Sequence, residues 1–443
     1  MLDAYGLASG AYPPASATCG DGAEHVDAAE AVSYVAYAVL AAAIVDEPAK
    51  LSRLHDHMRH HGLEATAVRG HVGALAARAV MARHPLNPPP IPLQPLNEPS
   101  DTGNADCGRI ARADGWQPLC TQAAPGPPCT TQQVCFGALF NVTTYASGHT
   151  QPAEKALVSL RLPPLPTYTG NLSDLPFRGR QDAFADQHVA VLRAAAELGD
   201  YEKALVQVVA SSTSDRIALL AIAEAEARSL SLGDSATLLH GIAAAVHDAS
   251  AMSTTAKFLF TSARSVSILQ CAYAGRRLTA WMGPYQGVRA TRNTGDTRWR
   301  TYLATPPHPG YMSGSTAAAA AGTEVLARAL GDDAPRTANC QTLPAGGSAI
   351  EPRVDVGGRG YISGVSDVPN SGPATVGYSP ARDATICWPT WRRLARMVAD
   401  SRLYAGVHIS VDNEAGLVVG RDAGRRAWDY VQHIVDRMEV RHG

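Results

Sequence analysis

The chain has 443 residues and a formal net charge of −2, from 38 Lys and Arg against 40 Asp and Glu. General binders of nucleic acid or of membrane surfaces need a surplus of basic residues, so this balance excludes both classes of partner. The length allows two or three domains, or one elaborated helical domain. Any anion site must be a local cluster of positive charge within a nearly neutral molecule.

The first 84 residues predict the N-terminal helical part of a bundle. Residues 24–84 are rich in alanine and show no strand alternation, which favours two or three helices. The longest apolar run, Ala31–Val45, is shorter than the roughly 20 residues that a bilayer span requires, so we interpret it as a core helix and expect no membrane span. The opening MLDAYGLASG lacks the features of a secretory signal peptide, which leaves open whether the N-terminus is complete.

Residues 85–178 predict an irregular excursion rich in proline and cysteine. Proline runs such as Pro125–Pro128 are incompatible with a continuous helix. The chain has eight cysteines, four of which gather here without the Cys-x-x-Cys spacing of zinc sites: Cys107, Cys120, Cys129 and Cys135. We therefore expect disulfide bonds, which favour a secreted or other oxidising location; free thiols and a disordered linker are the alternatives.

Residues 179–443 predict a helical domain that carries the anion site. The helical pattern runs from Gln181 to about Met282, with breaks near Gly199, Ser211 and Gly233. Further helices are expected at about 315–330, 390–403 and 408–436, with loops at 284–312 and 331–386 and a short hairpin at 353–363. The predicted fold class is all-α, with helical bundles and long Pro/Gly-rich loops.

The segment Ser401–Asp412 combines a hydroxyl, a guanidinium, an imidazole and a carboxylate. Asp412 follows His408 by four residues, so on a helix the two share one face. The carboxylate can accept the Nδ1–H of His408 and leave Nε2 free as a nucleophile or metal ligand. Arg402 supplies a permanent planar cation for a tetrahedral oxyanion.

Two other segments provide further anion-binding groups. Lys257 and Arg264 are seven residues apart in an apolar helical stretch, which places both cations on nearly one face of the predicted helix. Ser313 and Gly314 open an alanine-rich helix, whose first N–H groups can cradle an anion. His308, in a proline-flanked loop just upstream, is a candidate hydrogen-bonding partner for that cradle.

The combined pattern is Lys257-x6-Arg264, then Ser313-Gly314, then Ser401-Arg402-x5-His408-x3-Asp412. It resembles the three-part signature shared by the vanadium haloperoxidases and the type 2 phosphatidic acid phosphatases. The stretch from Thr305 to Tyr311 and the residues around Asp412 resemble the haloperoxidase branch.

The resemblance implies a helical-bundle haloperoxidase that binds vanadate. Residues of all three motifs would hold the vanadate oxygens: Lys257, Arg264, Ser313, Gly314 and Arg402. His408 would be the axial metal ligand, supported by Asp412 behind it, and Lys257 would also assist catalysis. The implied reactants are hydrogen peroxide, a halide and a small organic substrate. His308 matches the histidine of bromoperoxidases, which favours bromide.

Three departures from the signature keep other functions open. Ser315 stands where the family has an acid/base histidine. A serine hydroxyl can hydrogen-bond to a ligand, but it is a poor acid or base toward that ligand near neutral pH. Met312 and Ser265 replace prolines. The alternatives are a non-catalytic oxyanion-binding relative and a phosphatase with His408 as nucleophile. Homo-oligomerisation also stays open.

Overall fold

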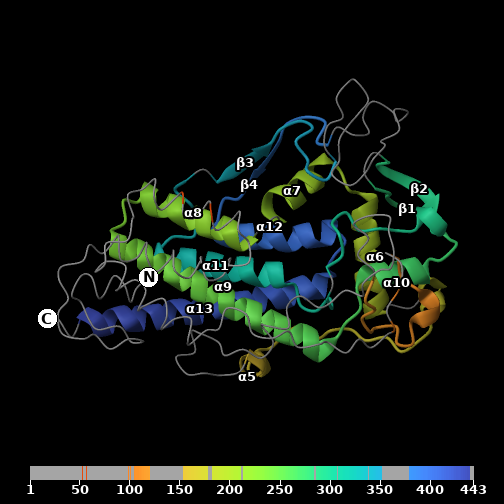
Figure 1. Cartoon of the computed structure of the whole chain (residues 1–443), viewed down its shortest axis with the longest axis horizontal. Coiled ribbons are helices and arrows are strands. Elements are labelled where there is room, and N and C mark those ends of the chain that lie inside the picture. Colours follow the sequence, from red (N-terminus) through yellow and green to blue (C-terminus); the bar gives the residue numbers. More distant parts are fainter. Residues whose placement is uncertain are drawn as a thin grey trace. The chain divides into compact units, whose positions relative to one another are not determined.

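The computed structural model divides the chain into two compact units, which are described separately (Figure 1). The described residues are Ser52, Asp56, Glu98, Ser100, 104–119, 153–177, 182–210, 213–283, 286–306, 308–337, 339–351 and 379–439. Of the helices predicted within residues 24–84 only Ser52 and Asp56 are described, both as helical; the hairpin predicted at 353–363 and Cys120, Cys129 and Cys135 lie outside the described residues. The three-domain division proposed from the sequence stays a prediction.

The first unit comprises Met1–Pro89, Ala221–Gly241 and Asp429–Gly443. Its described part contains the end of α8 (Thr213–Ala227), the start of α9 (Leu232–Phe260) and the end of α13 (Ser410–Glu439). Ala236 and Val431 form a small buried cluster against which Tyr430 packs. Glu224 in α8 forms an ion pair with Arg228, the residue that follows this helix.

The second unit, Pro90–Leu220 with Ile242–Trp428, is an assembly of helices and contains every candidate site residue. Its remaining helices are η1 (Cys107–Arg109), α5 (Ala153–Val158), η3 (Leu172–Phe177), α6 (Ala183–Ala196), α7 (Asp200–Ala210), α10 (Ser265–Ala272), η4 (Gly295–Thr297), α11 (Gly314–Ala329) and α12 (Trp391–Tyr404). Helix α12 packs against α11, α7 and α6, while α10 packs against α6 and η3. The all-α prediction is confirmed.

Helix α13 runs beside α11 (Figure 1). The two helices approach closely because three glycines of α13, at four-residue intervals, face α11. A Cβ atom on Gly416 would lie 2.7 Å from the Ser313 carbonyl oxygen, and one on Gly420 would lie 2.2 Å from that of Ala317. Gly424 meets the Ala321 carbonyl oxygen in the same way, at 2.5 Å. Residues four apart lie on one helix face, so these glycines form a flat strip along α13. The strip brings the start of α13 next to the start of α11.

Two short pairs of antiparallel strands correct the helix and loop boundaries predicted from the sequence. Strand β1 (Arg277–Trp281) pairs antiparallel with β2 (Val288–Arg292), although the helical pattern was extended to Met282 and residues 284–312 were predicted as loop. From Arg277 to Ala280 exposed and buried side chains alternate, which is the two-residue period of a strand, and Trp281 at the end of β1 is also buried. Strand β3 (Cys340–Leu343) pairs with β4 (Ala384–Cys387) at the ends of the second predicted loop.

Disulfide bonds, expected from the cysteine content, join Cys107 to Cys271 and Cys340 to Cys387. The first bond ties the proline-rich segment to α10, so the partner of Cys107 lies outside its own cysteine cluster. That segment also contains the short helix α5, where an irregular chain was expected. None of the helices in the described part of the chain is long and apolar enough to cross a membrane.

Candidate functional site

Lys257 lies in the last turn of α9 and is buried, with 4% of its surface exposed. Its ammonium donates to the carbonyl oxygens of Pro309, Gly310 and Met312, at 3.1, 2.9 and 2.5 Å. These three hydrogen bonds use the full donor capacity of a lysine. The cation therefore holds together the loop that leads into α11.

Arg264 does not share a helix with Lys257, which corrects the prediction of a common face. Helix α9 ends at Phe260, Thr261 has a φ of 43°, and Arg264 caps the start of α10. A β-branched residue at positive φ ends the regular helix, and the chain then turns back. The two cations meet through this turn.

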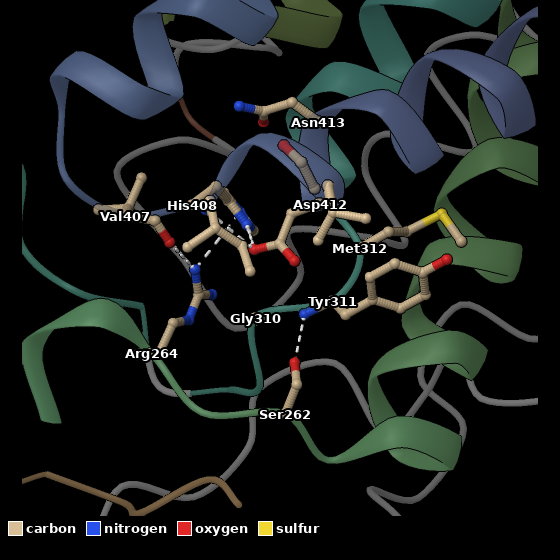
Figure 2. A network of polar contacts seen from close by, with 12 residues as sticks. Ser262, Arg264, Gly310, Tyr311, Met312, Val407, His408, Asp412 and Asn413 are labelled. Atoms are coloured by element: carbon tan, nitrogen blue, oxygen red, sulfur yellow. Dashed lines mark hydrogen bonds and ion pairs between the residues drawn. The ribbon is translucent and has the colours of Figure 1, made fainter. Parts of the chain in front are cut away.

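The Arg264 guanidinium joins the loop before α11 to the loop before α13. Its Nε donates to the His308 carbonyl oxygen at 2.9 Å, and its Nη1 donates to the carbonyl oxygen of Val407. The same Nη1 lies 3.4 Å from Nε2 of His408, so the guanidinium faces the open side of that imidazole (Figure 2).

His408 and Asp412 interact as the four-residue spacing predicts. Nδ1 of His408 lies 2.9 Å from Oδ2 of Asp412, and both side chains are about 95% buried. His408 lies two residues before α13 begins, whereas Asp412 is in the first turn of that helix. The same carboxylate oxygen accepts from the backbone N–H of Ile409 at 3.3 Å, an arrangement typical of a helix start. Since the carboxylate accepts from Nδ1–H, Nε2 carries the lone pair.

His308 contacts Arg264, and its role as a hydrogen-bonding partner of the cradle at Ser313 and Gly314 stays a prediction. Nη2 of Arg264 lies 2.9 Å from Nδ1 of His308. Nδ1 also lies 3.1 Å from the carbonyl oxygen of Pro309, so it accepts from the guanidinium in the tautomer that carries the ring proton on Nε2 and donates to Pro309 in the other. Burial, together with the charges of Lys257 and Arg264, lowers the pKa of His308 well below its usual value.

The start of α11 contributes a hydroxyl and free backbone donors. Ser313 caps this helix: its Oγ accepts from the Thr316 N–H at 3.4 Å, and its own N–H donates to the Asp412 carbonyl oxygen at 3.1 Å. Gly314 and Ser315 follow in the first turn and are half-buried. The first N–H groups of a helix lack intrahelical partners and carry its positive dipole end.

Three buried cations, Lys257, Arg264 and Arg402, lie within electrostatic range of His408. Burial lowers the pKa of Arg264 to about 10 and that of Arg402 to about 10, and Arg402 further lowers the pKa of Arg264. The pKa of Lys257 is well below its usual value because of burial and the charge of Arg264, which the charge of Asp412 opposes. With all three cations charged, the site carries a surplus of positive charge in a medium of low dielectric constant.

The pKa values of His408 and Asp412 are shifted in opposite directions. Burial and the neighbouring cations Arg264 and Lys257 lower the pKa of His408 well below 6.5, so the ring is neutral. Burial raises the pKa of Asp412 to about 6, against the opposing charges of Lys257 and Arg264. A neutral imidazole beside a surplus of cations can donate an electron pair to an electrophile or a metal.

The structure gathers most of the residues selected from the sequence. Lys257, Arg264 and His308 meet at the loop of residues 309–312, and the Ser313 backbone meets Asp412. The charge of Arg402 also lowers the pKa of His408, which puts this guanidinium within electrostatic range.

Sequence reasoning missed Gln187 and His188 of α6, which contact the starts of α13 and α10. A signal for His188 was present: it lies on the apolar stripe of α6 with Phe184, Val191 and Ala195.

Comparison with known proteins identifies a family model for the part of the chain that carries this site. Residues 237–437, which include every candidate site residue, match the family model of the VCPO second helical-bundle domain. No curated protein matches the chain by sequence.

Solved structures share the fold along almost the whole chain. A holo-type bacterial vanadium-dependent chloroperoxidase has a TM-score of 0.68 at 18% identity, over 98% of this chain and 90% of its own. An apo-type bacterial vanadium-dependent chloroperoxidase has a TM-score of 0.71 at 18% identity, over 98% and 91%. A bacterial vanadium-dependent iodoperoxidase has a TM-score of 0.58 at 14% identity, over 97% and 88%.

Proposed function

We propose that this chain, which belongs to the vanadium haloperoxidase superfamily, binds vanadate in the site around His408 and oxidises a halide with hydrogen peroxide. The observation that carries the proposal is the gathering of three buried basic side chains, those of Lys257, Arg264 and Arg402, around a neutral imidazole. A buried cation cluster of this kind is costly unless an anion compensates it.

The donor set fits a tetrahedral oxyanion. Two guanidiniums, an ammonium and the first N–H groups of α11 are all hydrogen-bond donors, as oxyanion recognition requires. Nε2 of His408 lies 3.4 Å from Nη1 of Arg264, and its lone pair would serve as the metal ligand. When bound, vanadate would supply a Lewis acid that activates hydrogen peroxide toward a halide.

Each residue of the site has a defined role in this proposal. Arg264 and Arg402 hold oxygens of the anion, and Lys257 does so by exchanging one of its three carbonyl partners for an anion oxygen. Ser313 and the Gly314 N–H complete the cradle. Asp412 keeps the proton of His408 on Nδ1, so that Nε2 stays available. His308 orients Arg264 by accepting from Nη2. A small organic molecule would then receive the oxidised halogen, for which the match at His308 favours bromide.

Ser315 favours a second candidate function, an oxyanion-binding protein that does not turn over. A hydroxyl in the first turn of α11 can hydrogen-bond to a bound ligand, but it does not ionise near neutral pH and is therefore a poor general acid or base. This residue bears on proton transfer and leaves the anion-binding donors intact.

The deciding experiment is bromination of a phenol reporter with hydrogen peroxide and bromide, with and without orthovanadate. The proposal predicts activity only when vanadate and peroxide are both present, and its loss in His408→Ala. Ser315→His is expected to raise the rate by about 10²-fold, the usual contribution of a general acid/base.

Other outcomes point elsewhere. Absence of halide oxidation in the wild type and in Ser315→His, alongside tight vanadate binding, would support the oxyanion-binding protein. Phosphate trapped on His408 from a phosphomonoester without vanadate would support a phosphatase.

A further inference from the structure

Two neighbouring residues of α6 contact both halves of the anion site. Nδ1 of His188 lies 3.1 Å from Oγ of Ser265, the residue that follows Arg264. Oε1 of Gln187 accepts from the backbone N–H of Val411 at 3.0 Å, between His408 and Asp412 in the chain. Successive side chains of a helix project about 100° apart, which lets two neighbours reach two different targets.

His188 is a buried imidazole, 2% exposed, whose ring stacks edge-on against Phe184 at 4.7 Å. Burial lowers its pKa to about 3, so it adds no charge to the nearby cations. Its Nε2 has no hydrogen-bond partner among the described residues, which makes Ser265 the one polar contact of this ring there. Burying an imidazole that makes a single hydrogen bond is energetically unfavourable, which indicates that the bond to Ser265 holds a structural element in place.

Ser265 is the first residue of α10, a position where proline is favourable because no backbone donor is lost. Serine gives up the rigidity of proline and gains a hydroxyl, which meets His188. Arg264, the preceding residue, has extended backbone angles of −93° and 146° and no side-chain cap, since its guanidinium enters the site. The contact with His188 fixes the point from which the Arg264 side chain departs.

Gln187 fixes the start of α13. The Val411 N–H belongs to the first turn of that helix, where backbone donors lack intrahelical partners. Asp412 satisfies the neighbouring N–H of Ile409, and Gln187 satisfies that of Val411. The turn that carries His408 and Asp412 is thereby held from α6 as well as from within.

We propose that Gln187 and His188 are positioning residues: one turn of α6 sets the distance and orientation between the Arg264 guanidinium and the His408 imidazole. Through Ser265 and Val411 they act on the anion-binding groups without touching the anion. The part of this inference that concerns vanadate affinity rests on the proposed function; the part that concerns the His408 ring does not.

The test uses full-length variants that remove or restore single contacts. Gln187→Met keeps the length of the side chain and removes its amide oxygen. Ser265→Ala removes the hydroxyl with little change in volume, and His188→Leu removes the imidazole from the other side. His188→Asn restores a polar atom near the position of Nδ1 and serves as the rescue. Gln207→Met is the matched control, because Oε1 of Gln207 also accepts a backbone N–H, that of Ala349, at 3.1 Å.

The first readout is the NMR signal of the His408 ring in protein labelled with ¹⁵N-histidine, identified by its loss in His408→Ala. We expect the ring signals to move in Gln187→Met, Ser265→Ala and His188→Leu, and to return toward wild type in His188→Asn. Gln207→Met should leave them unchanged. Unchanged ring signals in folded Gln187→Met and Ser265→Ala would overturn the inference, whether or not the protein binds vanadate.

The second readout is the Kd of orthovanadate, measured by calorimetry well below the unfolding temperature of each variant. Loss of a supporting contact is expected to weaken binding about 10-fold, as for partners behind metal ligands, with recovery in His188→Asn. If the wild type binds no vanadate, the proposed function fails and the ring signals decide the positioning role. If it binds and the variants match it, the α6 contacts do not position the anion site.

Discussion

At the scale of single residues, the chemistry of the site depends on how few anionic groups face its cations. Asp412 is 3% exposed, and its Oδ1 has no hydrogen-bond partner among the described residues, while Oδ2 serves both His408 and the Ile409 N–H. One carboxylate therefore orients the imidazole and also lowers the net charge of the cluster. Its raised pKa reflects the cost of that buried position.

Replacing Asp412 by Asn tests its role in holding the His408 ring. The amide keeps the shape but carries no charge, and it can donate to a ring nitrogen, which allows the wrong tautomer of His408. We expect vanadate affinity or halide oxidation to fall by about 10- to 100-fold. Asp422→Asn on the same helix, which removes a partner of Arg425 and Arg426, is the control and should retain wild-type values. Equal vanadate affinity and halide oxidation in the two variants would show that Asp412 does not hold the His408 ring.

The sequence predicted the His408–Asp412 bond and the helix start at Ser313 and Gly314 because both depend on neighbours in the chain. A four-residue spacing and a serine before an alanine-rich helix are local signals. The partners of the Lys257 ammonium were not predictable in this way. They are backbone carbonyls some fifty residues away, and carbonyls leave no mark in the sequence.

At the scale of elements, the distance between α11 and α13 decides whether the two halves of the site meet. The strip of Gly416, Gly420 and Gly424 lets the backbones approach to a separation that no larger residue permits. Asp412 lies four residues before Gly416, on the same face of α13, where its carbonyl oxygen accepts from the Ser313 N–H. Helix packing thus connects the segment that carries His408 to the start of α11.

Gly420→Ala tests this close approach. The new Cβ would lie 2.2 Å from the Ala317 carbonyl oxygen and 2.6 Å from the Ala320 Cβ, so the helices must separate. Forced overpacking of this kind costs about 1–3 kcal/mol in the free energy of unfolding, measurable by urea titration. Arg421→Ala, at the next, exposed position, should change stability by less than about 0.5 kcal/mol. An equally stable Gly420→Ala would contradict the packing described above.

The boundaries that sequence reasoning missed share a physical cause. The turn at 261–264 follows apolar, helix-compatible residues and becomes visible only through the positive φ of Thr261 and its contacts: the Thr261 carbonyl oxygen accepts from the Trp116 N–H. The β1–β2 hairpin likewise depends on pairing between strands. Tertiary contacts override local preference at both places. The breaks near Gly199 and Ser211, by contrast, match the ends of α6, α7 and α8.

At the scale of the whole molecule, near neutrality of net charge coexists with a buried cationic site. The formal charge of −2 describes the chain as a whole, whereas Lys257, Arg264 and Arg402 are concentrated in one buried site. Burial of these cations and of the neutral histidines costs free energy on folding. Stability should accordingly depend on pH through those histidines.

Acidification from pH 7 to 5.5 is expected to destabilise the fold. The pKa values of His188, His308 and His408 are lowered in the folded protein, so the unfolded chain binds more protons as the pH falls below 6.5. Each such histidine contributes a loss of about 1 kcal/mol over this interval. Asp412 acts in the opposite direction, because its raised pKa lets the folded state take up a proton first, between about pH 6 and 4.

Urea unfolding at both pH values measures this dependence. The His188→Asn variant should lose about 1 kcal/mol less than the wild type on acidification, because it lacks one buried histidine. His433→Asn, at an exposed position of α13, is the control and should follow the wild type. If His188→Asn and the wild type show the same loss, His188 is not held neutral by burial.

The most direct test of the central claim is calorimetric titration of the full-length protein with orthovanadate. The account predicts saturable binding of one vanadate per chain, at least about 100-fold weaker in Arg264→Met and in His408→Ala, and unchanged in Asp422→Asn. Absence of saturable binding to the wild type, or equal binding to all four proteins, would contradict it.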